Sequence, residues 1–207
     1  MLLENLKKAV VRAAKDAEAM GLCKHRSGNF SALERATGLI CLTPSGVDRR
    51  GMDESDIVVM DMMGRVVEAK EGRVPSSEYM MHIAAYETRP DVVAVAHTHS
   101  PYALVMAVMR KTIPPVMAEM MHLNLRAGHI PVTNYAKAGT KMLAESVESP
   151  LIISDAVLIA NHGVLTVDDE SVDEALLKAA YVEEAAMVYY RVLLIGEDVP
   201  EIPIDDI

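Results

Sequence analysis

An apolar segment in the middle of the chain, VVAVAHT at residues 92–98, sets the strongest limit on the fold. It is short, rich in β-branched residues and free of polar alternation, which is typical of a strand buried on both faces. A second segment of this kind, AVLIAN, occupies residues 156–161. A sheet that contains such strands needs helices on both of its faces. We therefore expect an α/β fold.

Periodicity and turn signals predict the other elements. Helices are expected at residues 2–20, 76–88, 101–109, 138–148 and 170–195. Further strands are expected at residues 39–43, 56–61, 65–69 and 129–135. Short turns join several strands, which excludes a purely parallel sheet and favours a mixed one. The sequence contains no linker, repeat or low-complexity segment, so residues 1–207 are expected to form one domain. Its acidic, proline-broken tail is expected to be loose or draped over a surface.

The composition excludes several classes of partner. A formal net charge of −10 disfavours nucleic acid and anionic membrane surfaces. The N-terminal segment carries charge throughout, unlike a signal peptide, and no apolar run approaches the ~20 residues of a membrane span. The two cysteines, Cys23 and Cys41, have neither zinc-ligand spacing nor a disulfide framework. We expect reduced thiols in a cytoplasmic protein.

Histidines end both of the buried segments. His97 and His99 are two residues apart, so on a strand they point to one face, about 7 Å apart along the chain. His162 ends the second segment, directly before a glycine. Pockets open at the ends of neighbouring strands, and three histidines with an open position are typical of a catalytic metal site. A divalent cation would satisfy these imidazoles. The remaining histidines are expected to be structural or surface residues: His25, His82, His122 and His129.

Three stretches of small residues could bind an anion: SGN at 27–29, TPSG at 43–46 and PSSE at 75–78. Each pattern is also that of an ordinary turn, so a shared site requires that the three meet in space. Ser76 and Ser77 open a predicted helix, where free N–H groups and the helix dipole favour a phosphate. Glu78 follows them, either as a carboxylate favoured by the dipole or as a general acid/base or metal ligand beside the anion.

The sequence contains five short motifs in a fixed order: SGNFS (27–31), LTPSG (42–46), PSSE (75–78), HTHS (97–100) and NHG (161–163). In this order and at these separations they resemble the class II aldolase/adducin family, and most nearly its L-fuculose-1-phosphate aldolase group. The likeness covers roughly residues 5–195.

The resemblance implies a three-layer α/β/α domain with a central mixed, largely antiparallel sheet, and a C4 homotetramer with active sites at subunit interfaces. It implies a zinc-dependent lyase that cleaves a ketose 1-phosphate, such as L-fuculose 1-phosphate, to dihydroxyacetone phosphate and a small aldehyde. His97, His99 and His162 would be the metal ligands, and Mn²⁺, Co²⁺ or Fe²⁺ would also suit them. Glu78 would be the catalytic residue and a further metal ligand when substrate is absent. The implied phosphate site comprises Gly28, Asn29, Ser45, Gly46, Ser76 and Ser77.

The sequence departs from the family pattern in its aldehyde-recognition half. The family's proton-donor tyrosine follows an IP dipeptide, and the matching position here is Ala118, followed by Glu119. A second family tyrosine, in a longer tail, has no counterpart in a sequence that ends at Ile207. Tyr135 occupies a family-like position in VTNY. The sequence therefore leaves the aldehyde and the physiological substrate open.

Other branches of the same family offer alternative functions. L-ribulose-5-phosphate 4-epimerases carry an aspartate where this chain has Glu78, and methylthioribulose-1-phosphate dehydratases share the histidine triad. Adducin-like members act as binding or scaffold proteins and tend to lose the metal ligands, all of which this sequence retains. The pattern favours the aldolase.

Overall fold

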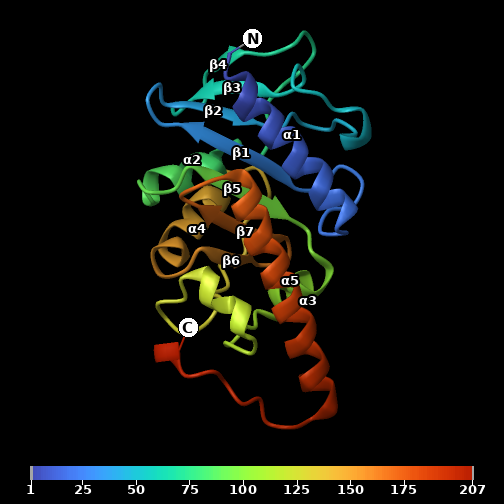
Figure 1. Ribbon diagram of the computed structural model, residues 1–207, viewed down its shortest axis with the longest axis vertical. Helices are drawn as coiled ribbons and strands as arrows, with labels where there is room; N and C mark the ends of the chain where they lie inside the picture. Colours follow the sequence, from blue (N-terminus) through green and yellow to red (C-terminus); the bar gives the residue numbers. More distant parts are fainter. Residues whose placement is uncertain (1, 207) are drawn as a thin grey trace.

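The computed structural model describes residues 2–206 and arranges them in three layers around a central sheet (Figure 1). Helices α1, α3 and α5 pack on one face of the sheet, and α2 and α4 pack together on the other. The expected three-layer α/β/α architecture is confirmed. The helices are α1 (Glu4–Ala19), α2 (Tyr79–Thr88), α3 (Pro101–Met109), α4 (Lys141–Ile153) and α5 (Val172–Ile195).

The seven strands follow the order β4-β3-β2-β1-β5-β7-β6, and every pairing between neighbours is antiparallel. The largely antiparallel sheet is therefore confirmed. Its parallel component is an isolated bridge between Val132 and Leu158. The strands are β1 (Asn29–Glu34), β2 (Leu39–Leu42), β3 (Val58–Asp61), β4 (Val66–Glu68), β5 (Ala94–Thr98), β6 (Ala156–Ile159) and β7 (Gly163–Asp168).

Alternation along the central strands divides the core into two sides. On β5, Ala94 and Ala96 pack toward α1 and α5, whereas Val95 packs toward α2 and α4. On β1, Phe30 lies on the α1 side and Leu33 on the α2 side. Both faces of the central strands are therefore buried, as the apolar runs predict.

Strand direction places three chain segments at one edge of the sheet. β7 lies between β5 and β6 and runs antiparallel to both, so the C-terminal ends of β5 and β6 share an edge. β1 is antiparallel to β5, and its first residue, Asn29, lies opposite His97. This edge therefore gathers the SGN turn and the two histidine-bearing strand ends.

Some predicted elements differ from the observed ones. The strand expected at 129–135 is wrong: this segment makes isolated bridges, and Pro131 within it has no N–H to donate to a ladder. The helix expected at 76–88 begins only at Tyr79, because Ser76 first closes a turn. Its carbonyl accepts from the N–H of Tyr79 at 3.1 Å, and its hydroxyl accepts from the N–H of Glu78 at 3.3 Å.

Strands β1 and β7 were not predicted from the sequence. β1 carries polar Asn29 and Ser31 among its apolar residues, and β7 follows β6 so closely that no turn stands out between them. After α5 the chain turns back, and the N–H of Ile202 donates to the carbonyl of Pro115 at 2.9 Å. Among residues 2–206, no helix combines the length and apolar character that crossing a membrane requires.

Candidate metal centre and active site

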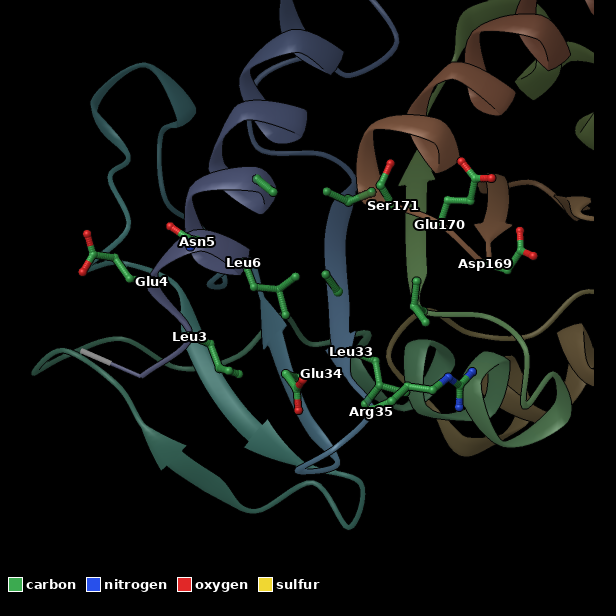
Figure 2. A pocket seen from close by; sticks show the side chains of 14 residues that line it. Leu3, Glu4, Asn5, Leu6, Leu33, Glu34, Arg35, Asp169, Glu170 and Ser171 are labelled. Atoms are coloured by element: carbon green, nitrogen blue, oxygen red, sulfur yellow. The ribbon is translucent and has the colours of Figure 1, made fainter.

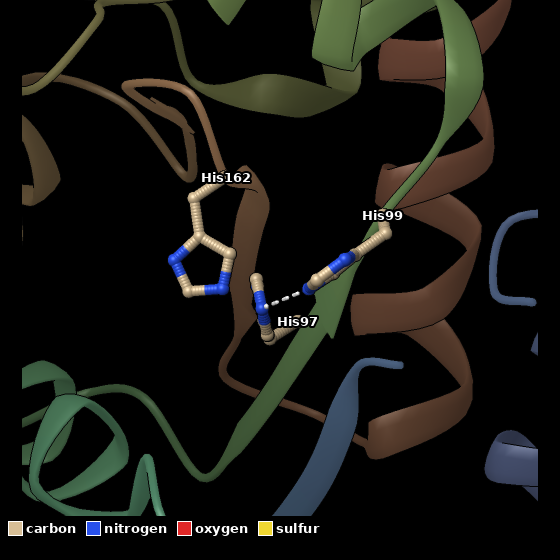
Figure 3. Close-up of side chains that lie close together, drawn as sticks. All are labelled: His97, His99 and His162. Carbon is tan, nitrogen blue, oxygen red and sulfur yellow. Dashed lines mark hydrogen bonds between the residues drawn. The ribbon is translucent and has the colours of Figure 1, made fainter. Parts of the chain in front are cut away.

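Three imidazoles meet at the sheet edge described above. His97 lies near the end of β5, His99 follows that strand, and His162 lies in the turn between β6 and β7. One ring nitrogen of each lies within 4.8 Å of the other two, and the ring centroids are 4.8 to 5.0 Å apart. Figure 3 shows the rings turned toward a common point. The structure thus brings together the three histidines that the strand ends predict.

The glycine after His162 permits this approach. A Cβ atom at Gly163 would lie 2.3 Å from the carbonyl oxygen of Thr98 and 3.1 Å from Cε1 of His97. A contact of 2.3 Å with a backbone atom is impossible, so any other residue would push the β6–β7 turn away from β5. The glycine of the NHG motif is therefore a steric requirement for the cluster.

The hydrogen bonding of His97 directs a free nitrogen into the cluster. Its Nδ1–H donates to the carbonyl of Val164 at 2.9 Å, which leaves Nε2 as an acceptor. This atom lies 3.1 Å from Nε2 of His99. A tetrahedral cation with metal–nitrogen bonds of about 2.0–2.1 Å spaces its ligands roughly 3.3 Å apart. Burial also lowers the pKa of His99 to about 3, which keeps that imidazole neutral, the form that binds metals.

Glu78 closes the fourth side of the cluster. The residue is 7% exposed; its Oε2 lies 3.3 Å from Nε2 of His97, and its Oε1 lies 3.0 Å from Nε2 of His162. Burial raises the pKa of Glu78, but the adjacent imidazoles of His162 and His97 outweigh burial and hold the pKa below its usual range. Oε1 has no hydrogen-bond partner among residues 2–206. An ionised, unpaired carboxylate oxygen beside three imidazoles is the donor set that a divalent cation fits.

The three small-residue turns meet beside this cluster. They line one hollow of about 260 Å³, together with Glu78, His99 and His162. Two backbone hydrogen bonds hold the second turn against the third: Ser45 N–H to the Val74 carbonyl at 2.9 Å, and Ser76 N–H to the Thr43 carbonyl at 3.2 Å. The residues of the predicted anion site all line this hollow: Gly28, Asn29, Ser45, Gly46, Ser76 and Ser77.

Two arginines near the first turn were not predicted as site residues. Arg26 lines the hollow directly, and its position next to the SGN motif is a signal that could have identified it. Arg49 is buried and donates to the carbonyls of Ser27 and Gly28, the latter at 2.8 Å. A Cβ atom at Gly28 would lie 2.6 Å from the His97 carbonyl, so this turn also packs tightly against β5. No local pattern around Arg49 indicates this role.

The remaining candidates lie away from the hollow. Its lining contains no tyrosine among the described residues, and neither Ala118 nor Glu119 contributes to it. Tyr135 is 63% exposed. His25, His122 and His129 lie outside the cluster, as expected. The ring of His122 stacks on that of Tyr181, with 5.7 Å between the ring centroids. His82 is also outside the cluster but is fully buried and hydrogen-bonded to Asn29.

A larger hollow of about 770 Å³ opens at the opposite edge of the sheet (Figure 2). It lies between the start of α1, the C-terminal end of β1 and the segment after β7. Its charged lining is mainly acidic, with Glu4, Glu34, Asp169 and Glu170 against Arg35. This balance of charge is unsuited to a phosphate, so the candidate active site is the smaller hollow at the histidine edge.

Fold and site define a class of protein, and comparison with known proteins places the chain within it. The family described as Class II Aldolase and Adducin N-terminal domain matches residues 8–190. The chain belongs to this family.

Individual relatives support the same assignment. A 5-deoxy-D-ribulose 1-phosphate aldolase from Bacillus thuringiensis serovar kurstaki is 35% identical over 198 residues, which cover 95% of this chain and 90% of the relative. An L-fuculose phosphate aldolase from Escherichia coli K12 is 31% identical over 202 residues, or 98% and 90% of the two chains. A solved structure of an L-fuculose 1-phosphate aldolase matches with a TM-score of 0.92 and 34% identity, covering 100% of this chain and 94% of that one.

Proposed function

We propose that this protein is a metal-dependent aldolase that cleaves a ketose 1-phosphate to dihydroxyacetone phosphate and a small aldehyde. One observation carries the proposal: the Glu78 carboxylate lies between a cluster of three imidazoles and three phosphate-type turns, at one hollow that His99 and His162 also line. The names of the relatives support it, because they act on 5-deoxy-D-ribulose 1-phosphate and L-fuculose phosphate. Both names denote sugar phosphates, which supports a sugar phosphate as the substrate of this protein.

The phosphate end of the substrate would lie on the three turns. Their hydroxyl groups and main-chain N–H groups offer hydrogen bonds to phosphate oxygens without a fixed charge. Arg26, at the rim of the same hollow, would supply the opposite charge that the turns lack. In a chain with a net charge of −10, this local cation favours an anionic substrate at this edge of the sheet.

The imidazole cluster would hold the cation. Bound by His97, His99 and His162, a divalent ion would supply Lewis acidity toward the oxygens at the reacting end of the substrate. Neutral imidazoles with one carboxylate suit Zn²⁺, and they also suit Mn²⁺, Co²⁺ and Fe²⁺. The hydrogen bond from His97 to Val164 keeps its Nε2 directed into the site before any ion arrives.

Glu78 would move the proton. Its carboxylate is ionised, so it can take a proton from the carbon of dihydroxyacetone phosphate that becomes the nucleophile, and return one in cleavage. Its Oε2 accepts a hydrogen bond from Nδ2 of Asn29 at 2.8 Å, which fixes that oxygen. Oε1 has no such partner and is the oxygen left to act.

The proposal includes a homotetramer in the cytoplasm, as the family resemblance implies, in which residues 1–207 act as one domain. The hollow contains no tyrosine from the described part of its own chain, so the proton donor toward the aldehyde would come from elsewhere. An active site at a subunit interface would provide it from a neighbouring copy. Tyr135, exposed on the surface, is available for such a role.

Retro-aldol turnover tests the proposal. The metal-loaded protein would be supplied with L-fuculose 1-phosphate and 5-deoxyribulose 1-phosphate, and release of dihydroxyacetone phosphate would be coupled to a reporting dehydrogenase. L-ribulose 5-phosphate, whose cleavage cannot yield dihydroxyacetone phosphate, would be assayed separately for epimerisation. We expect release that a chelator abolishes and that Glu78→Gln lowers by about 10²–10⁴-fold. The exposed Glu145→Gln is the matched control and should retain activity.

Two results would contradict the proposal. Undiminished release from Glu78→Gln would remove Glu78 from the chemistry. Epimerisation of L-ribulose 5-phosphate, or loss of water from a methylthioribulose phosphate, in place of aldehyde release would assign the same site to the epimerase or dehydratase branch.

A further inference from the structure

A line of five polar side chains runs from the candidate active site into the core between β1 and α2. Glu78, directly before α2, and His82 and Tyr86 within it are spaced four residues apart and so lie on one side, while Asn29 and Ser31 alternate on the facing side of β1. All five are buried, with Ser31 and His82 no more than 1% exposed. The two rows face each other, and hydrogen bonds cross between them at every step.

The contacts form one unbranched chain. Asn29 Nδ2 donates to Glu78 Oε2 at 2.8 Å, and Asn29 Oδ1 lies 2.5 Å from His82 Nε2. His82 Nδ1 lies 2.6 Å from Ser31 Oγ, which is 2.7 Å from the Tyr86 hydroxyl. Glu78 lies against the imidazole cluster and Asn29 belongs to the SGN turn, whereas His82, Ser31 and Tyr86 make no hydrogen bond to the cluster within the described residues.

The chemistry of the groups fixes the direction of every bond. An ionised carboxylate only accepts, so the NH₂ of Asn29 must face Glu78 and its Oδ1 must face His82. His82 therefore donates from Nε2 and accepts at Nδ1, which Ser31 satisfies with its hydroxyl proton. Burial lowers the pKa of His82 to about 3, consistent with this neutral form. Tyr86 then donates to Ser31.

The opposite orientation of Asn29 would be costly. A flipped amide would place its carbonyl oxygen against Glu78 Oε2 and its NH₂ against the N–H of His82, two repulsive contacts in a buried site. The carboxylate favours one orientation of the amide, and the N–H of His82, donating to Oδ1, stabilises that same orientation. Buried polar groups need hydrogen-bond partners, but that need alone does not require their chain to end at Glu78, the group proposed to transfer the proton.

We propose that His82 and Ser31 are positioning residues for the proton transfer by Glu78, acting through the amide of Asn29. This inference rests on the proposed function. Without the donor from His82, Asn29 would populate both amide orientations, and Glu78 Oε2 would lose its fixed position. Metal binding by the imidazoles would be retained, because neither His82 nor Ser31 contacts the cluster. His82 contacts the SGN turn through the side-chain amide of Asn29, which is already bonded to Glu78. The hydroxyl and main-chain N–H groups of the turns would therefore remain in place to bind the substrate phosphate.

The test isolates the step that Glu78 performs. Exchange of the hydroxymethyl protons of dihydroxyacetone phosphate with D₂O, followed by proton NMR on the metal-loaded protein, requires proton transfer but no aldehyde. We expect His82→Leu to lower the saturated exchange rate by about tenfold or more, while the half-saturating concentration changes less than about twofold. Metal content, measured by mass spectrometry, should equal that of the wild type.

Two further variants separate positioning from packing. His82→Gln offers an NH₂ to Asn29 and a carbonyl to Ser31, so it should restore most of the exchange that His82→Leu loses. Tyr86→Phe breaks one buried bond but leaves Ser31 donating to His82, so it should lower the melting temperature while keeping the exchange rate. Ser31→Ala should slow exchange, and it decides the matter if His82→Leu does not fold.

Each remaining outcome counts against the inference. If a folded His82→Leu variant exchanges protons at the wild-type rate, the chain of hydrogen bonds has only a structural role. The same conclusion holds if the leucine and glutamine variants lose the exchange rate equally. No exchange by the metal-loaded wild type would overturn the proposed function itself, and the inference with it. Failure of the proposed function is distinguishable from failure of the inference, because it already appears in the wild-type protein.

Discussion

Replacement of Gly163 by alanine should damage the imidazole cluster although it replaces none of the proposed metal ligands. The added Cβ would stand 2.3 Å from the Thr98 carbonyl oxygen, 3.1 Å from Cε1 of His97 and 3.3 Å from Cδ2 of His99. The first of these atoms is a main-chain oxygen in the last residue of β5, paired with β7, and cannot rotate away as a side chain could. The β6–β7 turn, which carries His162, must therefore move.

The size of the movement follows from the contact. Ordinary van der Waals separation begins near 3.4 Å, so the turn must retreat by about 1 Å. Metal–nitrogen bonds tolerate deviations of only about 0.2 Å, so His162 would no longer share an ion with His97 and His99 in good geometry. We expect affinity for Zn²⁺ to fall by about 10–100-fold, as for losses of supporting contacts around metals. Overpacking should also cost about 1–3 kcal/mol of unfolding free energy.

Competition with a fluorescent zinc chelator would measure the affinity, and urea denaturation the stability. Gly51→Ala is the matched control, because a Cβ there meets nothing within 4 Å and Gly51 has no positive φ. It should leave both quantities unchanged. Wild-type zinc affinity in Gly163→Ala would refute the argument that the close approach of this turn sets the geometry of the cluster.

Three further predictions concern the metal, the carboxylates and the thiols. Zn²⁺ at a free concentration 100 times its Kd should raise the unfolding free energy by about 2.7 kcal/mol, an effect that urea denaturation should not detect in His162→Ala. Asp56 is buried, which raises its pKa, but the main-chain N–H of Asp53 and the guanidinium of Arg73 outweigh burial and lower the pKa overall. Its contribution to stability is therefore present above the unfolded value of about 3.9 and is lost as the pH falls through the folded pKa. Asp56→Asn should cost about 1–3 kcal/mol at pH 7 in urea denaturation, with the difference from wild type shrinking in acid. Burial raises the pKa of Cys41 to about 12 and also raises that of Cys23, so mass spectrometry should find neither thiol alkylated by iodoacetamide at pH 8 until the protein is denatured.

The sequence predicted the features that depend on strong local patterns. The buried runs at 92–98 and 156–161 contain β5 and β6. The helical spacing of apolar residues at 170–195 ends at Gly196, which adopts a positive φ at the end of α5. The positions of His97, His99 and His162 at strand ends were enough to expect their meeting, because the ends of strands that run in the same direction share a sheet edge.

Features that depend on tertiary contacts were missed. The strand that completes the site, β1, was hidden because Asn29 and Ser31 break its apolar pattern, and both are polar in order to pair with α2. His82 was expected to be an ordinary structural residue for the same reason: its partners lie about fifty residues away. The four-residue spacing of Glu78 and His82 was visible, but the strand they face was not.

The hydrogen bond from His97 to Val164 joins positions 67 residues apart in the chain. Closing so long a loop is slow compared with forming the helices between, so the pairing of β5 with β7 should be among the later events of folding. Until it forms, His162 lies on a different segment from His97 and His99, so the three imidazoles cannot share an ion. The moment at which a refolding chain first captures a metal would therefore time the completion of the central sheet.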